Sequence, residues 1–129
     1  MTEKRLALEC KAMHERWGKE PKLRRRSNGE FFWKMTLKTE GNDFPIEIGY
    51  PISYPAAPPY LIAKFIIQPG TGHVIHGNPC WINPGTTRAK NQWMPAYDTA
   101  ALVVGVAYRW VQCYSVWLAI KKWPMEEAI

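Results

Sequence analysis

Hydrophobic positions near the start of the chain repeat with a helical period. Over residues 3–17 the apolar side chains follow one another at steps of four, three and four residues: Leu6, Cys10, Met13 and Trp17. Charged residues lie between them, so the spacing predicts an amphipathic helix. Gly18 is suited to end this helix, and Pro21 prevents its continuation.

The pattern then changes to that of β-strands separated by turns. Turn residues gather at 27–29 and again at 41–43. Residues 31–38, between the two turns, are rich in aromatic and other strand-favouring types and predict a strand that pairs with a short basic strand before the first turn. Residues 44–50 alternate apolar residues with Pro45, Glu47 and Gly49, which predicts a third strand.

Prolines interrupt the regular pattern after the third strand. Residues 51–59 hold four of them and predict a rigid extended connector, because each proline lacks an amide donor and restricts its predecessor. The mostly apolar residues 60–68 predict a fourth strand. Residues 69–95 then form a long irregular region of a length that is uncommon in compact domains and often functional.

The last predicted element is a long helix that begins at Asp98 or Thr99 and runs to about residue 122. It is almost apolar all round, and about 20 apolar residues would suffice to cross a bilayer. Arg109, Gln112 and Ser115 interrupt this stretch near its middle. These residues favour packing against a sheet, so we expect no membrane contact.

Length and composition fit one compact domain over residues 1–129. A chain of 14.9 kDa with 47% hydrophobic residues can bury a core without disulfides or structural metals. The predicted class is α+β: an N-terminal helix, a four-stranded antiparallel sheet, a long irregular loop and a long C-terminal helix. Three cysteines cannot all pair and the start of the chain is charged, which predicts free thiols and a cytoplasmic location.

The net charge of +6 is concentrated near the N-terminus. Residues 1–26 hold nine basic and four acidic residues, and the basic run ends in Arg24, Arg25 and Arg26. Such a cluster fits an acidic protein surface or nucleic acid, or is simply a solvated face. Stacking aromatic residues do not interleave with it, so nucleic-acid binding is not favoured.

Reactive side chains gather between residues 73 and 83. Cys80 lies in a stretch rich in Pro, Gly and Asn that could expose its sulfur, and His73 and His76 could stabilise a thiolate or move protons. We therefore predict Cys80 as the nucleophile. Cys10 and Cys113 fall on apolar helical positions, where cysteine usually serves as a small hydrophobe.

Other chemistries fit this cluster less well. His73, His76 and Cys80 supply only three zinc ligands, and no fourth ligand or Cys-x-x-Cys pair lies nearby, so we expect no metal and no cofactor. The zinc deaminase signature lacks its second cysteine and its His-x-Glu. A papain-like triad needs a base held by an orienting Asn or acid elsewhere in the fold, whereas all the histidines except His14 lie within seven residues of Cys80. Each histidine could equally be a loop residue bonded to backbone.

Residues 50–59 resemble the Tyr-Pro-x-x-Pro-Pro connector of ubiquitin-conjugating enzymes. As in that family, a strand, a histidine-containing loop and a cysteine follow. Trp93, with Met94 and Pro95, is similar to the Trp-x-Pro that follows the active cysteine of these enzymes. The resemblance extends from the first helix to the end of the chain.

The bacterial branch of this family is the more similar one. There His-Val-x-x-x-Gly precedes the cysteine. Here His73 and Gly77 resemble this motif with one residue fewer between them, and Cys80 and Trp81 follow in the same style. Such proteins occur in cyclic-oligonucleotide antiphage signalling systems (CBASS). They act beside a nucleotidyltransferase resembling cyclic GMP-AMP synthase, whose C-terminus is activated and conjugated to a target.

The resemblance implies that Cys80 accepts a partner's C-terminal acyl group as a thioester and passes it to an amine. His73, His76 and Asn78 are the candidate assisting residues, although the eukaryotic His-Pro-Asn tripeptide is missing. Candidate partner-binding residues are Arg24, Arg25, Arg26, Trp81 and Trp93. The implied partners are the nucleotidyltransferase tail and an activating enzyme. A non-catalytic binding module of the same fold and a basic nucleic-acid-binding domain are the alternatives.

Overall fold

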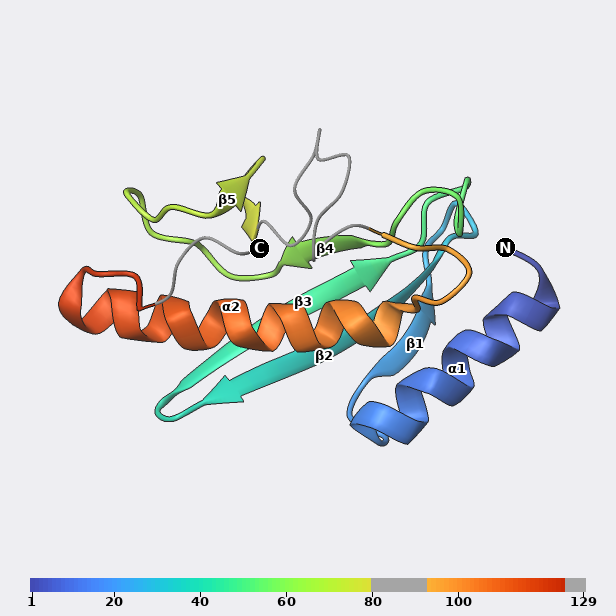
Figure 1. Cartoon of the computed structure of the whole chain (residues 1–129), viewed down its shortest axis with the longest axis horizontal. Helices are drawn as coiled ribbons and strands as arrows, with labels where there is room; N and C mark the ends of the chain where they lie inside the picture. The colour runs from blue at the N-terminus through green and yellow to red at the C-terminus, as the bar shows by residue number, and fades with distance from the viewer. Residues whose placement is uncertain (80–92, 125–129) are drawn as a thin grey trace.

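A computed structural model of the chain describes residues 1–79 and 93–124 (Figure 1). Two helices, a four-stranded antiparallel sheet in the order β1-β2-β3-β4 and a separate two-stranded hairpin make up the described fold. The elements are α1 (Glu3–Trp17), β1 (Lys22–Arg25), β2 (Phe31–Thr39), β3 (Asn42–Gly49), β4 (Tyr60–Ala63), β5 (Val74–Ile75), β6 (Asn78–Pro79) and α2 (Ala100–Ile120). The predicted α+β class is confirmed.

The core lies between one face of the sheet and α2, which crosses that face (Figure 1). Alternate residues of β2, Trp33, Met35 and Leu37, are buried, whereas Lys34 and Lys38 on the opposite face are exposed, as the two-residue period of a strand requires. Trp110 of α2 is among the largest fully buried side chains. In the part of the chain that the structure describes, the other sheet face carries no helix, as Figure 1 shows.

Helix α1 begins and ends where its sequence predicts. The Thr2 side chain accepts a hydrogen bond from the Arg5 amide at 3.0 Å, and Gly18, with φ 68°, forms the C-terminal cap. Met13 is fully buried, and the Trp17 indole donates to the Ala101 carbonyl of α2 at 2.9 Å. These contacts fix α1 beside the start of α2.

Helix α2 is the one helix of the described residues that is long and apolar enough to cross a membrane, and 39% of that stretch is buried inside the fold. Its buried residues belong to the core that α2 forms with the sheet and with α1. Thr99 is the N-cap residue, as predicted, but its side chain makes no capping hydrogen bond within the described helix. Asp98 instead accepts from the Met94 amide at 2.8 Å.

The fourth strand is shorter than the prediction of residues 60–68. It ends at Ala63, which pairs with Ile46. The backbone amide of the next residue, Lys64, donates to the Pro45 carbonyl at 2.9 Å. Pro45 has no N–H group that could donate to the Lys64 carbonyl in return. The ladder therefore stops there. The predicted irregular region also contains the hairpin β5–β6.

Candidate functional site

The chain reaches the predicted nucleophile through the hairpin β5–β6. His76 and Gly77 form its two-residue turn, with φ values of 51° and 77°. Positive φ at both central positions is the hallmark of a type I′ turn, which suits the twist of a two-stranded hairpin. The turn places the His76 side chain at an exposed tip.

Asn78 fastens this hairpin to the main sheet. Its Oδ1 accepts a hydrogen bond from the Ala63 amide at 2.9 Å, at the end of β4. Its Nδ2 donates to the His76 carbonyl at 3.3 Å, which braces the turn. Pro79, the last residue described before Cys80, is buried. The structure thus brings Asn78 and the backbone of His76 together.

His73 lies at the other end of the hairpin, against α2. Its carbonyl accepts from the Trp110 indole at 2.9 Å, and its ring stacks on Trp123 with centroids 4.4 Å apart. Its φ of 63° is left-handed, so the chain bends sharply before β5. The structure therefore places His73 and His76 at different ends of β5.

Cys80 and Trp81 lie outside the described residues, and their roles remain predictions. Cys113 is 3% exposed and Cys10 is half-buried. Burial raises the pKa of both thiols, and the charge of Glu9 adds to the effect at Cys10. A raised pKa disfavours the nucleophilic thiolate, so both cysteines suit the structural role predicted for them.

Trp93 points inward. It is 8% exposed, its indole donates to the Pro55 carbonyl at 2.8 Å, and its ring lies 5.7 Å from that of Tyr54. This side chain has little surface to offer to a partner, which argues against the partner contact predicted for it. Trp93 instead joins the segment before α2 to the proline connector.

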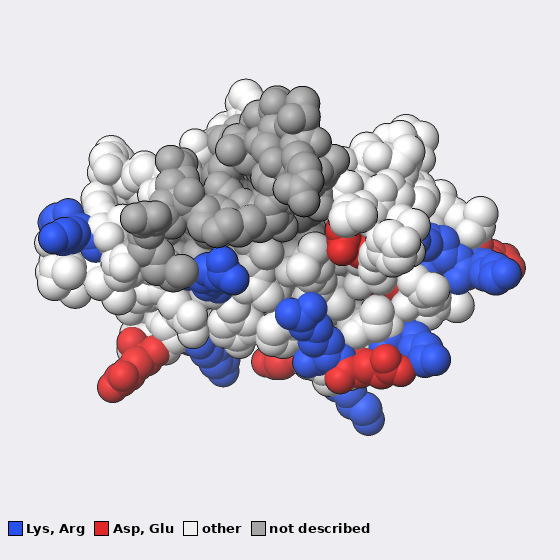
Figure 2. All heavy atoms as spheres, viewed as in Figure 1, with Lys and Arg blue, Asp and Glu red and all other residues white. Residues whose placement is uncertain are grey.

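The three arginines predicted to bind a partner differ in how strongly their side chains interact with the rest of the fold. Arg26 pairs with Glu47 at 3.0 Å and covers the Phe32 ring at 4.1 Å. Arg24 and Arg25 are exposed. Figure 2 shows basic and acidic groups side by side along one edge of the molecule rather than a field of one sign. Of the three, Arg24 and Arg25 are therefore the better placed to meet a partner.

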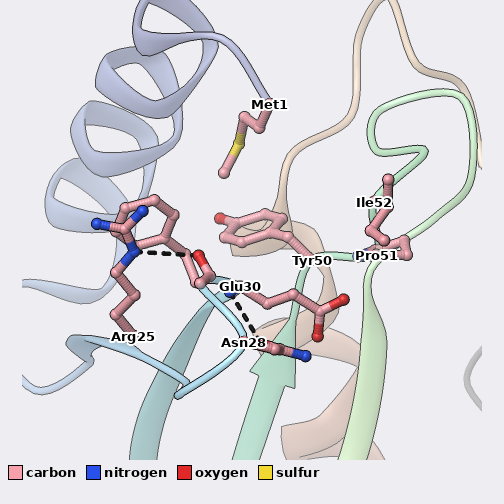
Figure 3. A pocket seen from close by; sticks show the side chains of 9 residues that line it. Met1, Arg25, Asn28, Glu30, Tyr50, Pro51 and Ile52 are labelled. Atoms are coloured by element: carbon pink, nitrogen blue, oxygen red, sulfur yellow. Dashed lines mark hydrogen bonds between the residues drawn. The ribbon is translucent and has the colours of Figure 1, made fainter.

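Arg25 also borders a cavity of about 360 Å³ between the first β-turn and the connector (Figure 3). Its Nε donates to the Gly29 carbonyl at 3.1 Å, and its guanidinium covers the Phe31 ring at 5.0 Å. Tyr50 and Ile52 line the connector side.

Within residues 1–79 and 93–124, no three His, Cys, Asp or Glu side chains cluster closely enough to hold a metal ion.

Glu9, for which the sequence led to no predicted role, is fully buried. It accepts hydrogen bonds from the side chains of Arg5, Tyr50 and Tyr54 and from the Ala100 amide. A signal was available, since Glu9 lies three residues after Leu6 and four before Met13, on the apolar stripe of α1. An acid on such a stripe requires buried partners.

The fold and the order of these features agree with a comparison of the chain with models of protein families. The family model for Type II CBASS E2 proteins matches residues 9–128. The chain belongs to this family. The resemblance to the bacterial ubiquitin-conjugating-like proteins of CBASS is thereby confirmed. No curated protein and no solved structure is significantly similar to this E2-like protein.

Proposed function

We propose that this CBASS-associated E2-like protein carries the C-terminus of a protein partner as a thioester on Cys80. The Cys80 thiolate attacks the carbonyl carbon of the activated C-terminus, for example a thioester on an activating enzyme. A new C–S bond forms and the old one breaks, and the departing thiolate takes up the proton that Cys80 lost. A target amine then attacks, an amide forms, and the Cys80 sulfur leaves as the thiolate.

The observation that carries this proposal is the fastening of β6 directly before Cys80 in the sequence. Asn78 bonds to the Ala63 amide, and Pro79 is buried. A nucleophile must be held in a reactive geometry, and misplacement by about 1 Å can cost about 100-fold in rate. An anchored strand directly before Cys80 in the sequence supports such positioning, and the family membership supports the same chemistry.

The residues around the hairpin have assigned parts in the proposal. Asn78 keeps a second Nδ2 hydrogen for the oxyanion of the tetrahedral intermediate, where one donor is typically worth about 100-fold to 1000-fold. His76 takes the proton from the attacking amine, because its exposed imidazole is a common type of general base. His73 holds the start of the hairpin against α2.

The acyl donor proposed is the C-terminal tail of a nucleotidyltransferase resembling cyclic GMP-AMP synthase. This assignment rests on the family and its CBASS context. The exposed Arg24 and Arg25 would meet acidic groups of that partner or of an activating enzyme. The reaction would take place in the cytoplasm, where thiols stay reduced.

The test mixes the protein with its nucleotidyltransferase and an activating enzyme. We expect an adduct that an added thiol such as dithiothreitol releases by exchange with the thioester, and Cys80→Ser should abolish this thiol-labile adduct. Cys10→Ser and Cys113→Ser are matched controls and should form it normally. A thiol-labile adduct that survives Cys80→Ser contradicts the proposal. Partner binding with an unreactive Cys80 would instead favour the non-catalytic binding module.

A further inference from the structure

The buried carboxylate of Glu9 joins three segments that are far apart in the sequence. Its Oε1 accepts from the Tyr50 hydroxyl at 2.8 Å and from the Ala100 amide at 2.9 Å. Its Oε2 accepts from the Arg5 guanidinium at 3.1 Å and from the Tyr54 hydroxyl. Helix α1, the proline connector and the first residue of α2 therefore meet at one side chain.

Arg5 extends this junction to the segment before α2. Besides Glu9, its guanidinium donates to the Pro95 carbonyl at 3.1 Å and to the Asp98 carbonyl at 2.7 Å. Trp93 ties the start of the same segment to Pro55. Figure 1 shows this segment running beside the connector and the first turn of α1.

Glu9 also provides a hydrogen-bond acceptor for the first amide of α2, which has no partner within the helix. The first amides of a helix have no partner within it, and the Thr99 side chain makes no capping bond within the described helix. The Ala100 amide bonds to the Glu9 carboxylate instead, where the negative charge also favours the positive end of the helix. The donors around this carboxylate are protonated: burial and the Glu9 contacts raise the pKa of Tyr50 and Tyr54 far above the usual range.

We propose that Glu9 and Arg5 are positioning residues for acyl transfer. Arg5 and Glu9 fix residues 93–100, which come after Cys80 in the sequence. Asn78 and Pro79 fix the chain directly before Cys80. This inference rests on the proposed function. It adds that the geometry at Cys80 depends on a carboxylate in α1, 71 positions away in the sequence.

Glu9→Gln is the decisive variant because it keeps the shape of the side chain. A glutamine amide presents an NH₂ group to donors that need an acceptor, so the junction loosens without leaving a cavity. Glu15→Gln, on the exposed side of the same helix, is the matched control. Tyr54→Phe is a milder second variant, which removes one donor to Glu9 and one acceptor of Arg5.

The experiment measures two things at a temperature where all variants are fully folded by circular dichroism. The first is hydrogen exchange of the Met94, Asp98 and Ala100 amides. The second is the rate of adduct formation on Cys80 as a function of donor concentration. We expect faster exchange at these amides and a kcat lowered by about 10-fold to 100-fold in Glu9→Gln, with KM unchanged. Tyr54→Phe should show a smaller loss, and Glu15→Gln none.

The outcomes separate this inference from the proposed function. If the wild-type protein forms no adduct, the proposed function fails, and the exchange data alone decide whether Glu9 positions the segment. If the wild-type protein forms the adduct and folded Glu9→Gln matches it in kcat, the positioning role is refuted. Unchanged exchange at the three amides also refutes it.

Discussion

At the scale of single residues, Asn78 combines two tasks through the two ends of one amide. Its carbonyl oxygen holds the Ala63 amide, and its nitrogen donates to the His76 carbonyl. The first contact fastens the hairpin, whereas the proposed stabilisation of an oxyanion needs the nitrogen. Substitutions that keep one end and change the other can therefore separate the tasks.

Asn78→Asp keeps the acceptor for Ala63 and loses the amide donor. We expect this variant to retain the slow exchange of the Ala63 amide while adduct formation falls by about 100-fold. Asn78→Ala should lose both. Alkylation of Cys80 at the same pH controls for an effect of the new carboxylate on the thiol. Wild-type transfer by Asn78→Asp would show that Asn78 is only a brace.

His76 can be tested without disturbing the turn that holds it. Because Asn-Gly is the favoured pair in type I′ turns, His76→Asn should leave the hairpin intact. We expect discharge of the Cys80 thioester to an amine to slow by about 100-fold, since the general base is lost. The exchange of the hairpin amides serves as the control. Equal discharge rates would assign His76 to the turn alone.

At the scale of elements, close packing between strands fixes the edge of the sheet that receives the hairpin. Gly49 of β3 pairs with Tyr60 of β4, and the Tyr60 ring lies over it. A Cβ atom at Gly49 would overlap this ring. The absence of a side chain at this position is therefore a requirement of the packing, and not of a turn.

Gly49→Ala should destabilise the fold by about 1–3 kcal/mol, because the Tyr60 ring must move from its place. Gly72→Ala is the matched control, since no described atom lies within 4 Å of a Cβ there. We expect its unfolding free energy to stay within about 0.5 kcal/mol of the wild type. Urea denaturation measures both. An unchanged unfolding free energy for Gly49→Ala would contradict the placement of the Tyr60 ring over Gly49.

The elements themselves could largely be predicted from the sequence. The four-three-four spacing from Leu6 to Trp17 and the paired turn signals depend on local periodicity, which sequence shows directly. The end of β4 could not be predicted from local periodicity, because it depends on Pro45 in a neighbouring strand. The short hairpin was also missed, since His-Gly is a weaker turn signal than Asn-Gly.

The site was only partly predictable, for a related reason. Asn78 and the histidines drew attention because their types suit acyl transfer. Glu9 did not, because its partners Tyr50, Tyr54 and Ala100 are brought to it only by the tertiary fold. The burial of Trp93 likewise depends on Pro55.

At the scale of the whole molecule, the scaffold holds both ends of the Cys80-bearing stretch by independent contacts. One end is fastened to β4 through Asn78, and the other to α1 through Arg5 and Glu9. Helix α2 covers one face of the sheet and receives both His73 and Trp17. The proposed carrier of an acyl group needs such a stable frame on both sides of its nucleophile in the sequence.

The most direct test of this account is to map the adduct by tandem mass spectrometry. The wild-type protein is charged with the partner at neutral pH, digested and compared with a sample treated with hydroxylamine, which cleaves thioesters. The account predicts a hydroxylamine-labile mass on the peptide that contains Cys80. A labile mass on the Cys10 or Cys113 peptide instead, or a mass that resists hydroxylamine, would contradict it.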